Sequence, residues 1–254
     1  MIKKIFVTSY SFLIIGLAAI IFIPIVVLLF FTSLIGLRAI STEIIYKVAQ
    51  YASKLLVFFM GFKLSIDGQE NIPPRGKTGV CFVCNHSGIL DILLLLIAVG
   101  RPVGFIAKKE IIFVPFINLW MILLGGIFMD RNNPRKSLDA INRGAKKIMR
   151  GHSMAIFPEG TRSRGQGLLP FKTGSFRLAT AAGADIAPVA MSGSYSAFEK
   201  TGWVRPGHVY VSFGEVIKTT GTEHDGSRQY FSDKAHEEIA RLIKSQEEAQ
   251  SALS

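Results

Sequence analysis

The stretch TGVCFVCNHSGILDILLLLIAVG, residues 78–100, decides the fold class of this chain. Its first part is a short apolar run that ends at Asn85 and His86, as expected for a strand buried on both faces of a sheet. Its second part, from Gly88 to Gly100, is a longer apolar run that favours a helix. A buried strand that leads into a helix is typical of α/β folds.

The same alternation of strands and helices continues on both sides of this stretch. Further strands are expected at residues 63–68, 103–111, 125–131, 185–193 and 208–217, and at the start of 153–163. Further helices are expected at residues 41–62, 137–151, 174–184 and 232–250. We therefore predict an α/β domain over residues 63–254, preceded by a separate N-terminal part over residues 1–62.

The composition indicates contact with a membrane. Hydrophobic residues make up 49% of the 254 residues, charged residues only 19%, and the mean hydropathy is +0.37. The 29 Lys and Arg against 18 Asp and Glu give a net charge of +11, which attracts anionic lipid, phosphorylated substrates or nucleic acid. Because no nucleic-acid recognition motif is present, we predict membrane lipid and no nucleic acid as partners.

The N-terminal part is predicted to embed in this membrane. Residues 5–37 contain no charged side chain, and about 20 residues suffice to cross a bilayer. A cleaved signal peptide would have an apolar region of only ~7–15 residues and a small-residue cleavage site. We therefore expect a retained membrane-embedded helical segment, which either spans the bilayer or turns back near Pro24.

The helix expected at residues 41–62 has two interpretations. Lys47 and Lys54 are seven residues apart and lie on one face among apolar residues. This pattern fits a helix that lies at the membrane interface. It fits equally well an amphipathic helix that packs on the α/β domain.

Residues 111–129 also carry no charge, and hydropathy alone predicts a transmembrane helix there. Pro115, Asn118 and the pair Gly125-Gly126 instead favour a buried helix followed by a strand. A spanning segment would also place the polar clusters before and after it on opposite sides of the membrane.

Cys81 and Cys84 form a CxxC motif, which occurs in redox pairs and zinc sites. Further zinc ligands are lacking nearby, and residues three apart in a strand point to opposite faces. We predict two buried free thiols and, without a disulfide framework, a reducing compartment.

His86 and Asp91 are the first candidates for catalysis. Histidine accepts a proton near neutral pH, and a neighbouring carboxylate fixes its tautomer and stabilises the imidazolium. If His86 lies just before the helix and Asp91 in its first turns, the two side chains can meet. The spacing alone is a weak signal, because it occurs by chance in many proteins.

Three further polar clusters follow predicted strands. They are Lys108-Lys109-Glu110, Asp130-Arg131, and the segment FPEGTRS at residues 157–163, which contains Glu159, Gly160, Thr161 and Arg162. In α/β folds, ligands bind at the carboxyl ends of the strands. Arginine is suited to bidentate contacts with phosphate oxygens. Together the clusters indicate a base beside a phosphate-binding site.

These segments resemble, in order and spacing, the four blocks of the glycerolipid acyltransferase family. The matching segments are NHSGILD at 85–91, AKKEIIFVPFINLWMILLGGIFMDR at 107–131, FPEGTRSRGQGLLPFKTGSFRLA at 157–179 and IAPVAMSG at 186–193. The resemblance implies a mixed sheet flanked by helices and an N-terminal membrane-embedded segment. It also implies acyl transfer from a thioester to the 2-hydroxyl of 1-acylglycerol 3-phosphate, which makes phosphatidic acid for phospholipid biosynthesis.

The resemblance implies a role for each candidate. His86 and Asp91 would be the catalytic dyad, with the acceptor hydroxyl as the nucleophile and no metal or cofactor required. The substrate-binding residues would be Lys108, Arg131, Glu159, Gly160, Thr161 and Arg162. The partners would be lysophosphatidic acid and an acyl-CoA or acyl carrier protein. We expect the enzyme at the cell membrane with its catalytic domain on the cytoplasmic side.

One departure concerns the acceptor. Ser87-Gly88 stands where the family usually has Gln-Ser before the aspartate, so another acceptor, such as glycerol 3-phosphate or a lyso-ornithine lipid, is an alternative. A non-catalytic lipid-binding protein is a second alternative, although it would not need a base. A hydrolase with Ser192 or Ser194 as nucleophile is a third, but the chain lacks a Gly-x-Ser-x-Gly elbow.

Overall fold

The structure is a computed structural model that describes residues 8–10, 13, 24, 27–28, 31, 38–114 and 117–251. Most of the expected membrane-embedded segment, residues 5–37, therefore lies outside the described residues. Within the described part of the chain, none of the helices combines the length and apolar character that crossing a membrane requires.

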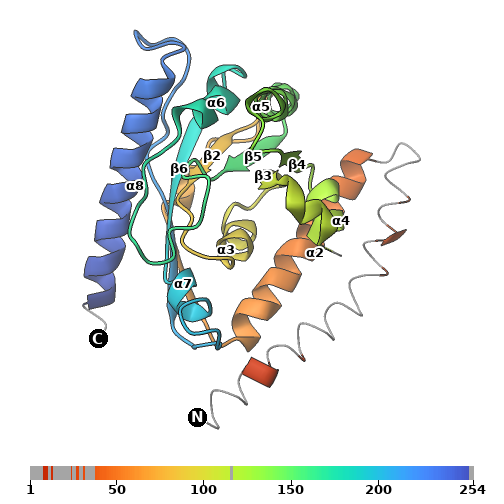
Figure 1. Cartoon of the computed structure of the whole chain (residues 1–254), viewed down its shortest axis with the longest axis vertical. Coiled ribbons are helices and arrows are strands. Elements are labelled where there is room, and N and C mark those ends of the chain that lie inside the picture. The colour runs from red at the N-terminus through yellow and green to blue at the C-terminus, as the bar shows by residue number, and fades with distance from the viewer. Residues whose placement is uncertain are drawn as a thin grey trace.

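The described residues form one seven-stranded sheet of order β1-β7-β6-β2-β5-β3-β4 (Figure 1). Neighbouring strands are parallel except β6 and β7, which are antiparallel, so the sheet is mixed as predicted. The strands are β1 Lys63–Asp67, β2 Cys81–Cys84, β3 Val103–Lys108, β4 Ile127–Met129, β5 Ser153–Ile156, β6 Ile186–Ser192 and β7 His208–Phe213.

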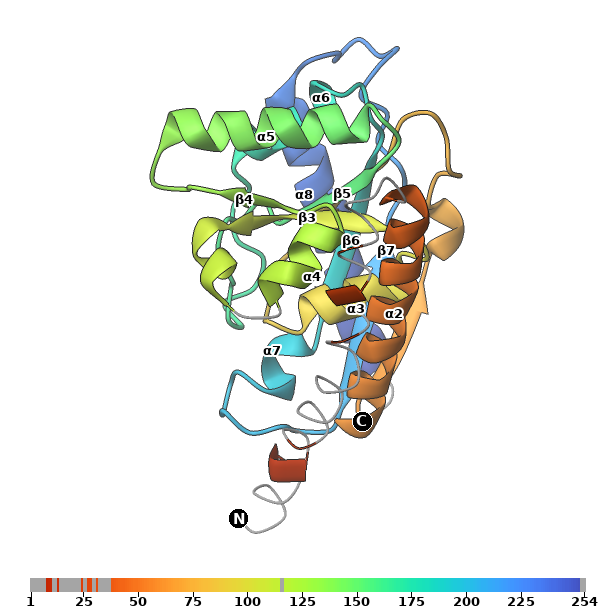
Figure 2. The ribbon, with the colours of Figure 1, turned by 90° about the vertical axis from the view of Figure 1, so that its right-hand side faces the viewer.

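Helices cover both faces of the sheet (Figures 1 and 2). Each face has its own apolar core. The α-helices are α2 Arg38–Phe59, α3 Asp91–Ala98, α4 Ile117–Leu123, α5 Pro134–Ile148, α6 Arg177–Thr180, α7 Ser194–Ala197 and α8 Arg228–Ser251. The 3-10 helices are η1 Gln69–Asn71, η2 Lys109–Phe113 and η3 Thr173–Phe176. Helices α2, α3 and α4 contribute to the core on one face, and α5, α6 and α8 to the core on the other.

Strand β2 lies in the middle of the sheet and is fully buried, which explains why its sequence is apolar throughout. Cys81 joins the core under α5 and α8, whereas Cys84 joins the core under α3. Both thiols are free and buried, as predicted, and burial raises the pKa of Cys81 to about 12.

Helix α2 packs on the α/β domain. The Tyr46 hydroxyl donates to the carbonyl of Leu96 at 3.0 Å, and the Gln50 amide donates to the carbonyl of Ile97 at 3.0 Å. Both acceptors lie near the end of α3, where helical carbonyls lack intrahelical partners. Its packing on the domain is therefore confirmed, and its contact with a membrane interface stays a prediction. Whether residue 62 is a domain boundary stays a prediction.

The segment at residues 111–129 is only partly as predicted. It forms part of η2, then the short helix α4, and then strand β4, so the order of helix and strand is confirmed. The helix is not fully buried, because Ile117 and Ile122 are exposed while Met121 and Leu123 enter the core.

Some boundaries differ from the predicted ones for local reasons. Helix α5 begins at Pro134, three residues earlier than expected, because the Asn133 side chain caps it by accepting from the Lys136 backbone N–H. The expected helix 174–184 is divided into η3 and the single turn of α6. Helix α7 was not predicted, because four residues are too short to show a hydrophobic period.

Candidate active site

The structure brings His86 and Asp91 together at the carboxyl end of β2. Asp91 is the first residue of α3, and its Oδ2 lies 2.8 Å from His86 Nδ1. A carboxylate in the first turn also interacts favourably with the helix dipole. Asp91 is fully buried, while the His86 side chain keeps 17% of its surface exposed. With its Nδ1 proton held by Asp91, His86 presents Nε2 as the basic atom.

Asp91 accepts two further hydrogen bonds. Its Oδ2 accepts from the Gly88 backbone N–H at 2.9 Å, and its Oδ1 accepts from the hydroxyl of Ser194. Ser194 is the first residue of α7, is buried, and bonds to the aspartate rather than to the histidine. These contacts assign Ser194 to positioning Asp91, a role that sequence analysis missed because 103 residues separate the two.

Replacing Ser194 with alanine is expected to lower kcat about tenfold and leave KM nearly unchanged, because a buried carboxylate oxygen would lose a partner worth about 1–3 kcal/mol. The measurement is steady-state kinetics beside thermal unfolding, with Ser192→Ala as the matched control. Complete loss of activity in a folded Ser194→Ala protein would instead indicate a nucleophilic serine.

The loop at residues 157–163 holds the backbone of His86. Glu159 Oε1 accepts from the His86 N–H at 2.8 Å, and the Ser163 N–H donates to the His86 carbonyl at 2.7 Å. The Phe157 ring stacks on the imidazole with centroids 4.2 Å apart. The segment FPEGTRS therefore orients the histidine from two sides, which explains why a carboxylate is buried there.

Asn85 fixes the other side of the histidine loop. Its side-chain amide donates to the Met191 carbonyl at 2.9 Å and accepts from the Met191 N–H at 2.7 Å. This pair of bonds connects the end of β2 to β6, so the fourth block of the sequence supports the first. The sequence alone does not reveal this role, because Asn85 and Met191 are 106 positions apart.

Glu159 is a buried acid whose charge is disfavoured. Only 4% of the residue is exposed, and burial raises its pKa from 4.5 to about 7, while the His86 N–H opposes this shift. An unfolded chain ionises this group near pH 4.5, whereas the folded chain keeps the proton until about pH 7. The folded state therefore binds more protons between these values, and its stability falls as the pH rises through this window.

Glu159→Gln is expected to flatten this part of the pH dependence of the unfolding free energy. The wild-type protein should lose up to about 3 kcal/mol between pH 4.5 and 7 from this group, and the variant should not, because glutamine keeps an acceptor without a titrating proton. Denaturant unfolding at several pH values measures the difference. Parallel curves for the two proteins would contradict the assignment.

Two cations lie at the turn that contains Gly160. The Arg131 guanidinium donates to the Gly160 carbonyl, and Lys172 Nζ lies so close that a Cβ on residue 160 would meet it at 2.7 Å. Gly160 also has φ 72°, a conformation that favours glycine. Lys108 is less confined, since it is half-exposed at the end of β3 and lies 3.6 Å from Glu110. Thr161 is exposed on the same turn as Gly160.

Arg162 is paired with a residue that sequence analysis missed. Its Nη1 lies 2.5 Å from Glu199 Oε1, and Glu199 Oε2 accepts from the Ile89 backbone N–H at 2.5 Å. Glu199 follows α7 and has no sequence motif that would single it out. A Cβ on Gly88 would lie 2.8 Å from Glu199 Oε2 and 3.0 Å from the Tyr195 nitrogen, so a larger residue at position 88 would have to displace the Glu199 carboxylate.

The arrangement combines a buried aspartate and its histidine partner with Lys108, Arg131 and Arg162, which follow the ends of β3, β4 and β5. The described residues contain no group of three His, Cys, Asp or Glu side chains that could hold a metal ion. Such a site is able to remove a proton from a hydroxyl beside an anionic group.

The acyltransferase family model matches residues 63–192, which include the dyad and the three other polar clusters. The chain belongs to the acyltransferase family. It is 32% identical to the 1-acyl-sn-glycerol-3-phosphate acyltransferase of Haemophilus influenzae over 77% of this chain and 81% of that protein. A protein of the same name from Cocos nucifera is 32% identical over 70% of this chain, but this match spans only 57% of the coconut protein.

A solved structure resembles this acyltransferase over nearly its whole length. The crystal structure of the 1-acyl-sn-glycerophosphate (LPA) acyltransferase PlsC from Thermotoga maritima superposes with a TM-score of 0.83, at 25% identity, and 97% of each chain is covered. The mixed α/β fold that the sequence predicts is therefore shared with a protein of that name.

Proposed function

We propose that this acyltransferase transfers an acyl chain from a thioester to the 2-hydroxyl of 1-acylglycerol 3-phosphate and so makes phosphatidic acid. The observation that carries the proposal is the contact between His86 Nδ1 and the buried Asp91, beside Arg131 and Arg162. Two relatives that are 32% identical to this chain are named 1-acyl-sn-glycerol-3-phosphate acyltransferase.

The chemistry follows from the orientation of His86. Its Nε2 takes the proton from the acceptor hydroxyl while the hydroxyl oxygen attacks the thioester carbonyl carbon. The new C–O bond forms, the C–S bond breaks, and the thiolate receives the proton from the imidazolium. Asp91 stabilises the imidazolium throughout. The donor is an acyl-CoA or an acyl carrier protein thioester, and the scheme uses no cofactor.

A phosphorylated acceptor fits the cations around the site. Arg162 uses Nη1 for Glu199, so its remaining N–H groups can bind phosphate oxygens. Arg131 is held by the Gly160 carbonyl, and Lys108 is exposed at the neighbouring strand end. In this arrangement Glu159 and Gly160 form the turn after β5 beside these cations, and Thr161 is the next residue of the same loop.

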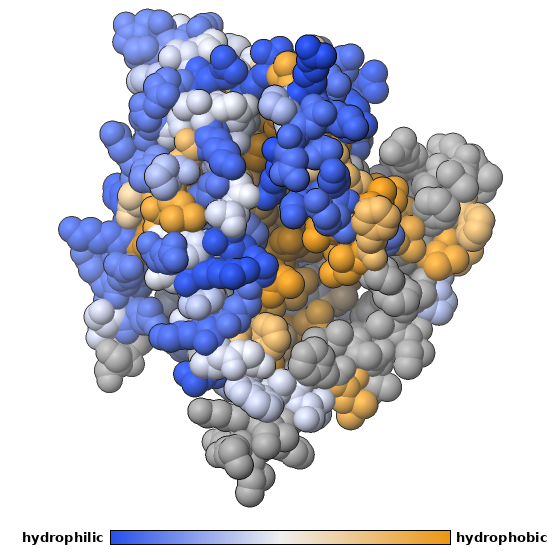
Figure 3. All heavy atoms as spheres, in the orientation of Figure 1, coloured by the Kyte–Doolittle hydropathy of each residue, from blue (hydrophilic) through white to orange (hydrophobic). Residues whose placement is uncertain are grey.

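The surface beside the site supports work at a membrane. Large apolar side chains are exposed on η2, α4 and α2, and Figure 3 shows hydrophobic residues gathered on this side. They are Ile112, Phe113, Val114, Ile117, Ile122, Ile44, Tyr51 and Phe58, and Phe113 is 83% exposed. Lys108 and Lys109 follow the same strand end and would face anionic headgroups.

The proposed function also includes a position of the protein relative to the membrane. Residues 5–37 embed in the cell membrane, and the apolar surface of η2, α4 and α2 lies on the bilayer. The site then faces the lipid acceptor from the cytoplasmic side, where acyl thioesters are made.

The test is acyl transfer by the detergent-purified full-length protein with a labelled acyl-CoA and a labelled acyl carrier protein thioester. The acceptors offered side by side are 1-acylglycerol 3-phosphate, glycerol 3-phosphate, a lyso-ornithine lipid and the unphosphorylated monoacylglycerol. We expect label mainly in phosphatidic acid, and the monoacylglycerol isolates the contribution of the phosphate. Label mainly in another product would identify a different acceptor for this enzyme. Acyl transfer to none of the four acceptors would refute the proposed acyltransferase activity.

A further inference from the structure

A cavity bordered by cations lies beneath α5 and shares Arg131 and Gly160 with the turn described above. The cavity has a volume of about 300 Å³ and lies between α5, the ends of β3, β4 and β5, and the η3–α6 turn. Its walls are formed by the apolar residues Ile106, Met129, Leu138, Ile141, Ile156 and Phe157. Phe157 is the residue that stacks on His86, so one wall of the cavity is directly behind the catalytic imidazole.

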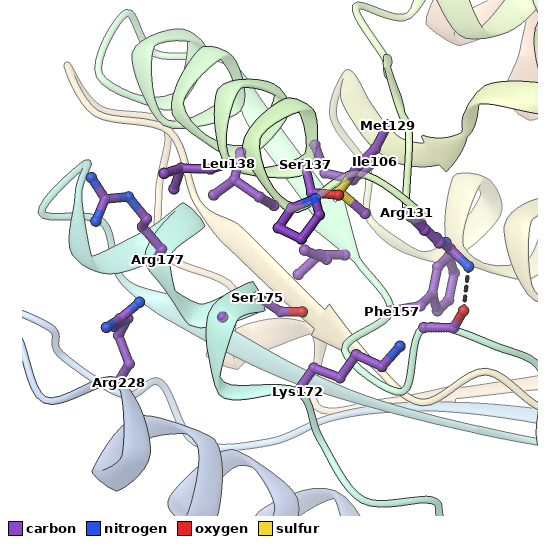
Figure 4. A pocket seen from close by; sticks show the side chains of 15 residues that line it. Ile106, Met129, Arg131, Ser137, Leu138, Phe157, Lys172, Ser175, Arg177 and Arg228 are labelled. Carbon is purple, nitrogen blue, oxygen red and sulfur yellow. Dashed lines mark hydrogen bonds between the residues drawn. The ribbon is translucent and has the colours of Figure 1, made fainter.

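Four cations border this cavity. Figure 4 shows Arg177 and Arg228 at one end and Arg131 and Lys172 at the other, with apolar side chains between. No Asp or Glu lines the cavity, and none of the four cations is within ion-pair distance of a carboxylate in the described part of the chain.

Two of the cations are held in place by neutral partners. Arg177 Nε donates to Asn142 Oδ1 at 2.9 Å, and Arg131 donates to the Gly160 carbonyl. Lys172 is positioned by its backbone, because its N–H donates to the Pro158 carbonyl at 3.0 Å and its side chain lies against Gly160. Holding like charges near one another costs free energy, and an anion bound between them offsets this cost.

We propose that this cavity binds a phosphate-bearing molecule with an apolar part, with its phosphates on the cations and its apolar part along the walls. Both substrates of the reaction proposed above are molecules of this kind, so the identity of the ligand rests on that proposed function. In the coenzyme A thioester, the phosphates would lie at Arg177 and Arg228 and the arm would run towards Phe157. In the lysophospholipid, the phosphate would lie at Lys172 and Arg131 and the chain along the walls.

Equilibrium binding to the full-length protein in detergent tests this proposal without turnover. The probes are labelled coenzyme A and labelled 1-acylglycerol 3-phosphate, each offered alone to wild type, Lys172→Ala and Arg228→Ala. The matched control is Lys146→Ala, which removes an exposed cation of α5 outside the cavity. The thermal unfolding of each variant shows that its fold is kept.

Loss of one charge-assisted contact is expected to weaken binding about tenfold. Weaker coenzyme A binding after Arg228→Ala assigns the cavity to the donor, and weaker lysophospholipid binding after Lys172→Ala assigns it to the lipid. The proposal is overturned if both variants bind both probes as the Lys146→Ala protein does, or if wild type binds neither. Because the experiment measures binding and not acyl transfer, its result can be interpreted even if the protein does not catalyse the proposed reaction.

Discussion

Replacing His86 with alanine is expected to lower kcat for acyl transfer by about 10²- to 10⁴-fold, the usual contribution of a positioned general base. His86 is the only one of the two dyad residues with exposed surface, so it alone can meet the acceptor hydroxyl. The KM values should change little, because the phosphate contacts lie on other residues. Steady-state kinetics with the purified protein measures both parameters.

The control for this variant is His152→Ala, which removes an exposed histidine outside the site. Both variants should unfold at nearly the wild-type temperature, because the His86 backbone bonds to Glu159 and Ser163 do not involve the imidazole. An active His86→Ala protein would show that another group removes the proton.

Asp91→Asn is expected to have an effect of similar size, about 10²- to 10⁴-fold on kcat. Asparagine has nearly the same shape, and its oxygen can still accept from Gly88 while its NH₂ group donates to the Ser194 hydroxyl. The lost property is the negative charge that stabilises the imidazolium beside it. The fold should therefore survive while the rate collapses.

Asp91→Ala serves as the contrasting variant, because it also leaves the buried Ser194 hydroxyl and the Gly88 N–H without an acceptor. It should lose about 1–3 kcal/mol more stability than Asp91→Asn, as measured by denaturant unfolding. The exposed Asp139→Asn is the charge control. If Asp91→Asn kept the wild-type rate, the charge of Asp91 would have no part in catalysis.

The sequence carried enough information to predict the central part of the fold and the dyad. Strand β2 is apolar throughout because it is buried on both faces. This made the strand, and the helix that follows it, recognisable from the sequence. His86 and Asp91 are only five residues apart, so a strand end and a helix start were sufficient to place them in contact.

The supporting residues could not be predicted in the same way. Ser194 and Glu199 reach the site from α7 and the loop after it, and they contact residues about 100 positions earlier in the chain. Neither lies in a periodic or charged pattern, so their roles depend on tertiary packing alone. The role of Lys172 also depends on tertiary packing, because its side chain lies against Gly160 and lines the cavity.

The structure also gives a physical reason for the departure at Ser87-Gly88. A larger side chain at position 88 would have to displace the Glu199 carboxylate and would crowd the start of α7, and these elements hold Arg162 and Asp91. The glycine therefore allows α7 and Glu199 to pack closely against the loop that carries the dyad.

The most direct test of the account is a rapid-quench experiment with the full-length enzyme, an acyl-labelled thioester and 1-acylglycerol 3-phosphate. The account predicts that label passes from the thioester to phosphatidic acid in one step while the protein itself stays unlabelled. Label that appears on the protein before phosphatidic acid forms would contradict direct attack by the acceptor hydroxyl, and so would the absence of labelled phosphatidic acid.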